Sequence, residues 1–113
     1  NVVAGQGESC GEILLRGALA GGAQAAGARI GRIAGPDAEG PWRADLLVLD
    51  GQAVALAGAT PDEVIDRWLF ASNRPMVDAV MIGGQWQVRG GRHRLREHVE
   101  SGYRRAVAQL AQL

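Results

Sequence analysis

The chain has 113 residues, of which 47% are hydrophobic and 21% are charged, a composition typical of a globular domain with a modest core. Its 12 basic residues, all Arg, balance 12 acidic residues, so no net charge directs the chain toward nucleic acid or an anionic membrane. Cys10 is the only cysteine, which excludes an intrachain disulfide and indicates the cytoplasm; no apolar run approaches the roughly 20 residues of a membrane span. We find no signal peptide, and a start at Asn1 rather than Met suggests a segment of a longer protein.

The first predicted element is a helix over residues 10–26, after a Gly-rich loop over residues 1–11. Ser9 and Glu12 fit a capping box, in which each side chain accepts a hydrogen bond from the backbone N–H of the other residue, and Gly27 fits a C-terminal cap. Internal glycines cost a helix about 1 kcal/mol each relative to Ala. Because such a helix gains from close approach to another element, we expect it to pack tightly at its glycines, which are Gly17, Gly21 and Gly22.

A strand and a second helix follow a long polar connection over residues 28–43. The apolar run over residues 44–50, closed by Asp50 and Gly51, predicts a strand buried on both faces. Residues 52–59 read as a loop. Thr60, with Glu63 three residues later, predicts a capped helix start, and Pro75 ends this helix.

The third part of the chain predicts a β-hairpin and a tail helix. Residues 76–82 predict a strand, and residues 85–89, which alternate in polarity, predict its partner across Gly83-Gly84, a two-residue turn. We expect Trp68 and Trp86 in the core of this small sheet. Apolar residues then recur at helical spacing over residues 94–113. The order is helix, strand, helix, hairpin, helix, and a three-stranded sheet with exposed edges indicates a missing partner.

Several of these segments resemble the amidohydrolase superfamily. RADLLVLD at residues 43–50 is similar to a strand of that superfamily, and VDAVMIGGQWQVRGGRH at residues 77–93 is similar to its closing hairpin. Within the superfamily the chain most resembles the formimidoylglutamate deiminases, through ALAGGAQAAG at residues 18–27, DRWLFA at residues 66–71 and GGRH at residues 90–93.

The resemblance implies an α+β fragment of a larger enzyme. Residues 1–34 would be the end of a (β/α)₈ barrel with its last helix, residues 35–93 the C-terminal half of a composite β-sandwich, and residues 94–113 a C-terminal helix. The parent enzyme would use zinc, held by ligands outside this chain, to hydrolyse N-formimidoyl-L-glutamate in histidine degradation. We therefore expect no catalytic, cofactor-binding or metal-binding residue here. The implied partners are the remainder of the enzyme chain and a second copy in a homodimer, with no nucleic acid and no membrane.

Three groups of residues invite a catalytic or metal-binding interpretation. His93 and His98 are five residues apart, whereas helical metal pairs are usually four apart, so we interpret them as surface residues. Asp45 and Asp50 flank a predicted strand, where carboxylates usually cap strand ends and turns. Cys10 lies at a helix N-terminus, where a thiolate is favoured, but no base is evident nearby and we interpret it as an unreactive thiol.

Two further patterns are weaker. Gly5-Gln6-Gly7 lacks the preceding strand and the later glycine of a phosphate loop. The six arginines of residues 89–105 could bind nucleic acid. Tyr103 is, however, the only aromatic residue interleaved with them, so we favour a solvated helix face or a subunit contact. Two alternatives remain open: a fragment of another amidohydrolase, acting on nucleobases or chlorinated aromatic rings, and a stand-alone interaction module that dimerises through its strand edges and tail helix.

Overall fold

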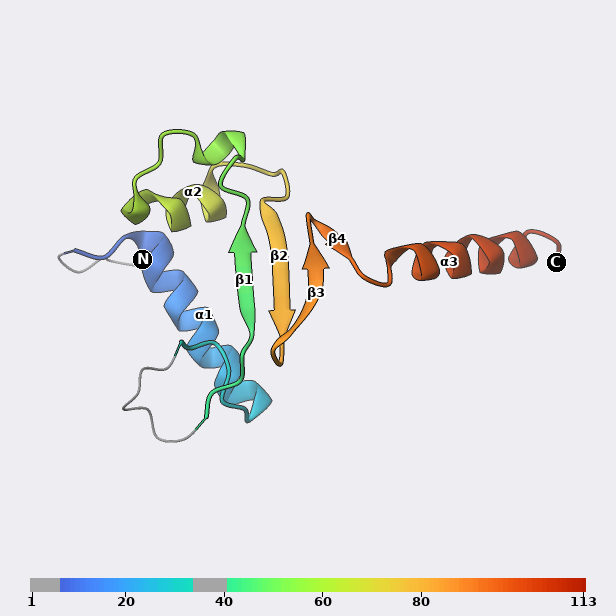
Figure 1. Cartoon of the computed structure of the whole chain (residues 1–113), viewed down its shortest axis with the longest axis horizontal. Helices are drawn as coiled ribbons and strands as arrows, with labels where there is room; N and C mark the ends of the chain where they lie inside the picture. The colour runs from blue at the N-terminus through green and yellow to red at the C-terminus, as the bar shows by residue number, and fades with distance from the viewer. Residues whose placement is uncertain (1–6, 34–40) are drawn as a thin grey trace.

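The computed structural model describes residues 7–33 and 41–113, and its first element is helix α1, Cys10–Ala26 (Figure 1). The N–H of Ser9 donates to Glu12 Oε2 at 3.1 Å, and the N–H of Glu12 donates to Ser9 Oγ at 3.2 Å. Gly27 ends the helix in the left-handed conformation, at φ 60°. The predicted helix, its capping box and its glycine cap are therefore confirmed.

A single antiparallel sheet with the strand order β1-β2-β3-β4 forms the centre of the structure (Figure 1). The strands are β1 Leu46–Leu49, β2 Val77–Ile82, β3 Gln85–Arg89 and β4 Arg92–His93. Gly83 and Gly84 have φ values of 58° and 80°, as a tight two-residue hairpin turn requires, so the predicted hairpin is confirmed. The prediction of three strands is wrong. Gly90 and Gly91, at φ 57° and 70°, form a second tight turn that returns the chain along β3 as β4.

The connection from β1 to β2 contains more regular structure than predicted. The expected loop over residues 52–59 contains a 3₁₀ turn, η1, Val54–Leu56. The expected helix begins with a second 3₁₀ turn, η2, Pro61–Glu63, and continues as α2, Val64–Phe70, which ends well before Pro75. The N–H of Thr60 donates to Glu63 Oε2 at 3.0 Å, which confirms that this pair holds the start of the helix.

Helices α1 and α2 meet at a single buried glycine. Gly11 lies in the first turn of α1, and its N–H donates to Oδ1 of Asp66 on α2 at 2.6 Å. A Cβ atom at Gly11 would lie 2.3 Å from that oxygen and 3.2 Å from the Asp66 backbone. Only glycine permits this approach, so the carboxylate of Asp66 both completes the cap of α1 and joins the helix to the β1–β2 connection.

The core is small for a chain of this length. Among the described residues, the buried hydrophobic side chains are Leu56, Met76 and Ala79, and both predicted core tryptophans, Trp68 and Trp86, are only half-buried. The accessible surface is 8910 Å², whereas a compact monomer of 11.9 kDa exposes about 6,000 Å². The elements are therefore regular, but most of their apolar surface has nothing packed against it.

Strand β1 shows this most clearly. Leu46, Leu47 and Val48 are all exposed, Leu47 by 48%. The prediction that this strand is buried on both faces is therefore wrong for the chain as it stands. The physical reason is that β1 is an edge strand, paired only with β2 among the described residues, and α1 leaves much of its surface uncovered.

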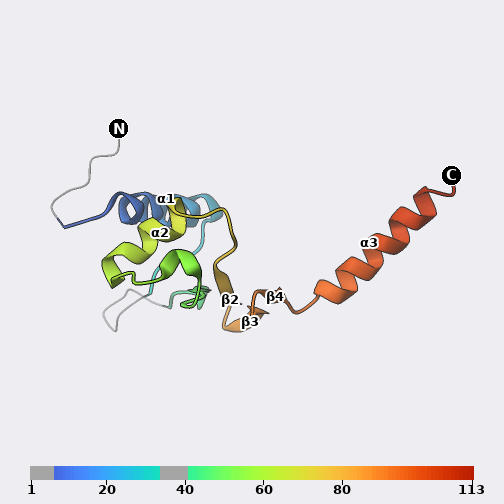
Figure 2. The ribbon, with the colours of Figure 1, turned by 90° about the horizontal axis from the view of Figure 1, so that it is seen from above.

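Helix α3, Arg96–Leu110, projects away from the sheet beyond β4 (Figures 1 and 2). It makes the molecule 61 Å long, with a radius of gyration of 18.3 Å where a compact chain of 113 residues has about 13 Å. The predicted tail helix is confirmed, although it begins two residues later than expected.

Candidate functional site

Exposed and half-buried apolar side chains gather where α1 and α2 face β1. A groove of about 420 Å³ opens there, and an adjoining groove of about 330 Å³ runs from α1 to β2. We call the surface around the two grooves the docking face. Its main apolar residues are Leu15, Leu19, Leu46, Leu47, Ile65 and Trp68. Exposed apolar surface of this extent usually marks a contact with another part of a protein.

The free edge of β1 borders the docking face and exposes backbone hydrogen-bonding groups. The strand is short and wholly apolar, and strands of that kind at an edge normally pair with another strand. Asp45, just before β1, fixes this region to the hairpin. Its Oδ1 accepts a hydrogen bond from the N–H of Gly83 at 2.7 Å and forms an ion pair with Arg43 Nε at 2.9 Å. The chemistry available here is association through apolar surface and strand pairing.

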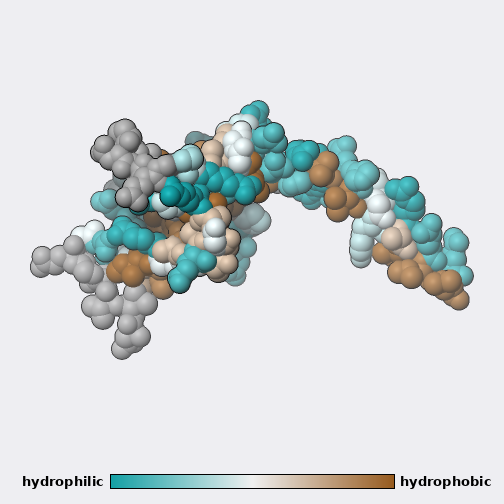
Figure 3. All heavy atoms as spheres, turned by 90° about the horizontal axis from the view of Figure 1, so that it is seen from below, coloured by the Kyte–Doolittle hydropathy of each residue, from teal (hydrophilic) through white to brown (hydrophobic). Residues whose placement is uncertain are grey.

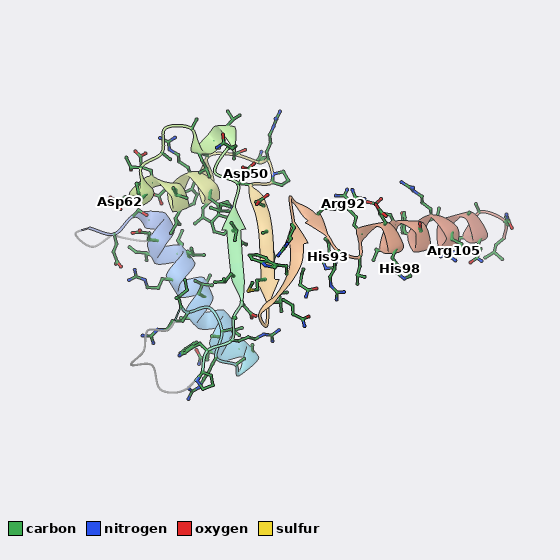
Figure 4. All side chains as sticks on the ribbon, viewed as in Figure 1. Asp50, Asp62, Arg92, His93, His98 and Arg105 are labelled. Atoms are coloured by element: carbon green, nitrogen blue, oxygen red, sulfur yellow. The ribbon has the colours of Figure 1, made fainter. Side chains whose placement is uncertain are left out.

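The two candidate aspartates have separate structural roles. Asp45 holds the β2–β3 turn, whereas Asp50, at the other end of β1, accepts a hydrogen bond from the N–H of Gln52 at 2.8 Å (Figure 4). The interpretation of both residues as strand-end and turn carboxylates is confirmed. They are not brought together, so they do not form a carboxylate pair for acid–base catalysis.

The two histidines and the cysteine lie on different elements. His93 is in β4, not at the start of the tail helix, and its Nδ1 accepts a hydrogen bond from the N–H of Leu95 at 3.1 Å. His98 is exposed on α3 (Figure 4). Cys10 is exposed at the first position of α1, and α1 lies on the other side of the sheet from α3 (Figure 1). Within residues 7–33 and 41–113, no three His, Cys, Asp or Glu side chains gather as a metal site would require.

The arginine cluster of residues 89–105 is largely engaged within the chain. The guanidinium of Arg89 stacks over the Trp86 ring at 5.1 Å. The other paired arginines are Arg92 with Glu97 at 2.8 Å, Arg94 with Gln87 at 2.8 Å, Arg96 with Glu100 at 2.7 Å, and Arg104 with Glu100 at 4.0 Å. Side chains bound in this way are less available to phosphate groups, which agrees with a solvated helix face rather than a nucleic-acid surface.

Two glutamates titrate below their ordinary range because their charged forms are hydrogen-bonded. The backbone N–H of Thr60, and next the charge of Arg67, lower the pKa of Glu63. The hydrogen bond from Arg96 and then its charge lower the pKa of Glu100. Both groups stabilise helix ends or faces, and neither lies in an enclosed cleft, so these shifts reflect local structure rather than a catalytic environment.

No local pattern in the sequence predicts the contact between Gly11 and Asp66. A glycine in a helical first turn is common, and its partner lies 55 residues away in sequence.

Of the Gly-rich start, Gly5 and Gln6 lie outside the described residues, and Gly7 has a φ of 92°. No helix in the described part of the chain combines the length and the apolar character that crossing a membrane requires.

Comparison with known proteins agrees with the resemblance seen in the sequence. The chain is 44% identical over 100 residues to a formimidoylglutamate deiminase from Pseudomonas aeruginosa, covering 88% of this chain and 21% of that protein. Its structure matches the crystal structure of an amidohydrolase from Brucella melitensis with a TM-score of 0.70 and 37% identity, covering 96% of this chain and 22% of that one. The resemblance to the amidohydrolases is confirmed. No protein-family model matches the chain.

The extent of these matches also shows how the chain relates to its amidohydrolase relatives. It spans about a fifth of the length of each of them, while nearly all of its own residues are matched. The exposed docking face and the small core are both features expected of a segment whose packing partners lie outside it.

Proposed function

We propose that the chain is the C-terminal segment of a zinc-dependent deiminase that hydrolyses N-formimidoyl-L-glutamate to N-formyl-L-glutamate and ammonia in histidine degradation. The observation that carries this proposal is the 44% identity, over 100 residues, to a protein named formimidoylglutamate deiminase. The cytoplasm is the proposed compartment, because a single cysteine suits a reducing environment.

The proposed role of the segment is structural. Residues 1–34, with α1, would close the barrel, residues 35–93 would supply one half of the composite sandwich, and residues 94–113 would form the tail helix. Three observations support this role: the open docking face, the unpaired edge of β1 and the excess accessible surface. If the rest of an enzyme packs against these surfaces, they are removed from water, and this burial would stabilise both the segment and the rest of the enzyme.

The described residues do not fit a zinc centre, since they bring no three candidate ligands together. We propose that the zinc and its ligands belong to the remainder of the enzyme chain and that this segment contributes no catalytic residue. Its contribution to activity would be indirect, through the position and rigidity of α1, which the Gly11–Asp66 contact joins to the β1–β2 connection.

The test is ammonia release by the full-length protein that carries this segment, with formimidoylglutamate compared against nucleobases and chlorinated aromatic substrates. We expect activity on formimidoylglutamate and none from the isolated 113-residue chain with added zinc. The double variant His93→Ala, His98→Ala should keep full activity in the full-length protein. Ammonia release by the isolated chain would disprove the purely structural role of the segment. A clear preference of the full-length protein for another substrate class would disprove the proposed substrate.

A further inference from the structure

The first turn of α1 is capped twice, once locally and once from a distant part of the chain. Ser9 and Glu12 form the capping box, which satisfies the N–H groups of both residues. The N–H of Gly11 donates instead to Oδ1 of Asp66 on α2, which lies against this end of α1 (Figures 1 and 2). Because the box already starts the helix, the bond to Asp66 is not needed to form α1. What it adds is a fixed position of this helix end against α2.

Few side chains in the described part of the chain reach from one element to a distant one. The bond at Gly11 spans 55 residues and that between Gly83 and Asp45 spans 38, whereas the remaining side-chain hydrogen bonds of the described residues span 10 or fewer. Helix α3 makes none of this kind, and its apolar side chains lie open at the surface (Figure 3). At Gly11, by contrast, an added Cβ would come within 3.2 Å of the Asp66 backbone, so the helix end is held as close to α2 as glycine permits.

Asp66 is itself presented by a braced support. The neighbouring Arg67 donates a hydrogen bond to the carbonyl oxygen of Ala57 at 2.7 Å, which joins α2 to the end of η1. The N–H of Asp50 donates to the carbonyl oxygen of Met76 at 2.8 Å and closes the base of the connection between β1 and β2. The carboxylate of Asp66 therefore reaches α1 from a connection that is tied at its base and across its middle.

The residues that lead into α1 are bound to it as well. Glu8 forms an ion pair with Arg16, and Ser9 is the N-cap residue. Under the proposed function, α1 is the last helix of a barrel. The active sites of such barrels form from the loops that run from the strands into the helices, so the N-terminal ends of the helices lie at the catalytic face. Asp66, in the sandwich half of the segment, therefore holds the end of α1 that belongs to that face.

We propose that Asp66 is a positioning residue of the enzyme: by holding Gly11, it keeps residues 7–9 in place at the catalytic face, so that the loop they end is ordered before substrate binds. This inference rests on the proposed function. Without the contact, substrate binding would carry the cost of ordering the loop. Because the ordered loop is the same in the bound state and in the transition state, the loss would raise KM and leave kcat nearly unchanged.

The test is steady-state kinetics of the full-length protein, well below its unfolding temperature, on the substrate that it turns over fastest. Asp66→Ala removes the acceptor, so we expect KM to rise at least about fivefold while kcat changes less than about twofold. Asp66→Asn keeps an acceptor oxygen and should restore most of the affinity. The matched control is Asp62→Ala, which removes an exposed carboxylate of the same connection (Figure 4) and should leave KM and kcat unchanged.

Hydrogen exchange of the full-length protein gives a second readout that needs neither substrate nor metal. Asp66→Ala should speed exchange of the amides of residues 11–13 about tenfold and leave residues 23–26, at the other end of α1, unchanged.

An unchanged KM in Asp66→Ala, whatever happens to its unfolding temperature, would overturn the proposal, because Asp66 would then only stabilise the fold. A fall in kcat larger than the rise in KM would also overturn it, because Asp66 would then act on the reacting groups. Neither readout depends on which substrate the enzyme prefers, so failure here is distinguishable from failure of the proposed function.

Discussion

Replacing Gly11 by Ala should destabilise the junction of α1 and α2. The new Cβ would lie 2.3 Å from Asp66 Oδ1, so the carboxylate must move and its 2.6 Å hydrogen bond to the Gly11 N–H is lost. Loss of a hydrogen bond to a charged group costs about 1.5–3 kcal/mol, and overpacking costs about 1–3 kcal/mol. The higher helix propensity of Ala returns at most about 1 kcal/mol. We expect a net loss of roughly 2–4 kcal/mol in the free energy of unfolding, taking these magnitudes together.

The matched control is Gly17→Ala, two turns further along the same helix. A Cβ at Gly17 meets no atom of the described residues within 4 Å, so the isolated chain should gain up to about 1 kcal/mol. Urea denaturation followed by circular dichroism measures both changes, and hydrogen exchange over residues 10–26 locates them. If Gly11→Ala unfolds at the same urea concentration as the parent chain or at a higher one, the described contact does not hold the two helices together.

Three further changes probe other contacts. Asp45→Ala removes the acceptor for the Gly83 N–H and should lower stability by about 1–2 kcal/mol in urea denaturation; no change would contradict its anchoring role. Because the pKa of Glu63 is lowered in the folded chain, its carboxylate stabilises the fold fully when the pH is above 4.5, the ordinary pKa of a glutamate. This stabilisation is lost as the pH falls through the pKa of the folded state. Glu63→Gln should therefore make α2 less acid-sensitive by hydrogen exchange, and unchanged sensitivity would count against the capping interaction. Val48→Arg should reduce the aggregation of the isolated chain, measured by light scattering, and should also reduce the yield of folded full-length protein. If neither the aggregation nor the yield changes, β1 has no partner.

Local structure could be predicted where the responsible residues are neighbours in sequence. The box of Ser9 and Glu12, the cap at Gly27 and the turn at Gly83-Gly84 each act over four residues or fewer, and all three are observed. Strand β4 was missed because Gly90-Gly91 reads equally well as an end and as a second turn. In a two-residue strand, the apolar pattern is too short to decide between them.

Burial was predicted less well because it depends on what packs against a segment. The apolar run of β1 matches a strand covered on both sides, yet Leu46 and Leu47 are exposed. The pattern is consistent with a covering partner outside the chain, which no local signal in residues 44–50 can reveal. The Gly11–Asp66 contact was missed for a similar reason, since its two residues come together only when the whole β1–β2 connection has folded.

The central claim is that this chain is a frame segment whose exposed apolar surfaces are covered by the rest of a larger amidohydrolase. Hydrogen exchange of the β1 amides, Leu46–Leu49, measured in the isolated chain and in the full-length protein, tests it most directly. At an edge strand with half of its hydrogen-bonding groups free, we expect rapid exchange in the isolated chain and strong protection in the full-length protein. Equally rapid exchange in both would contradict the claim, because β1 would then remain uncovered in the complete enzyme.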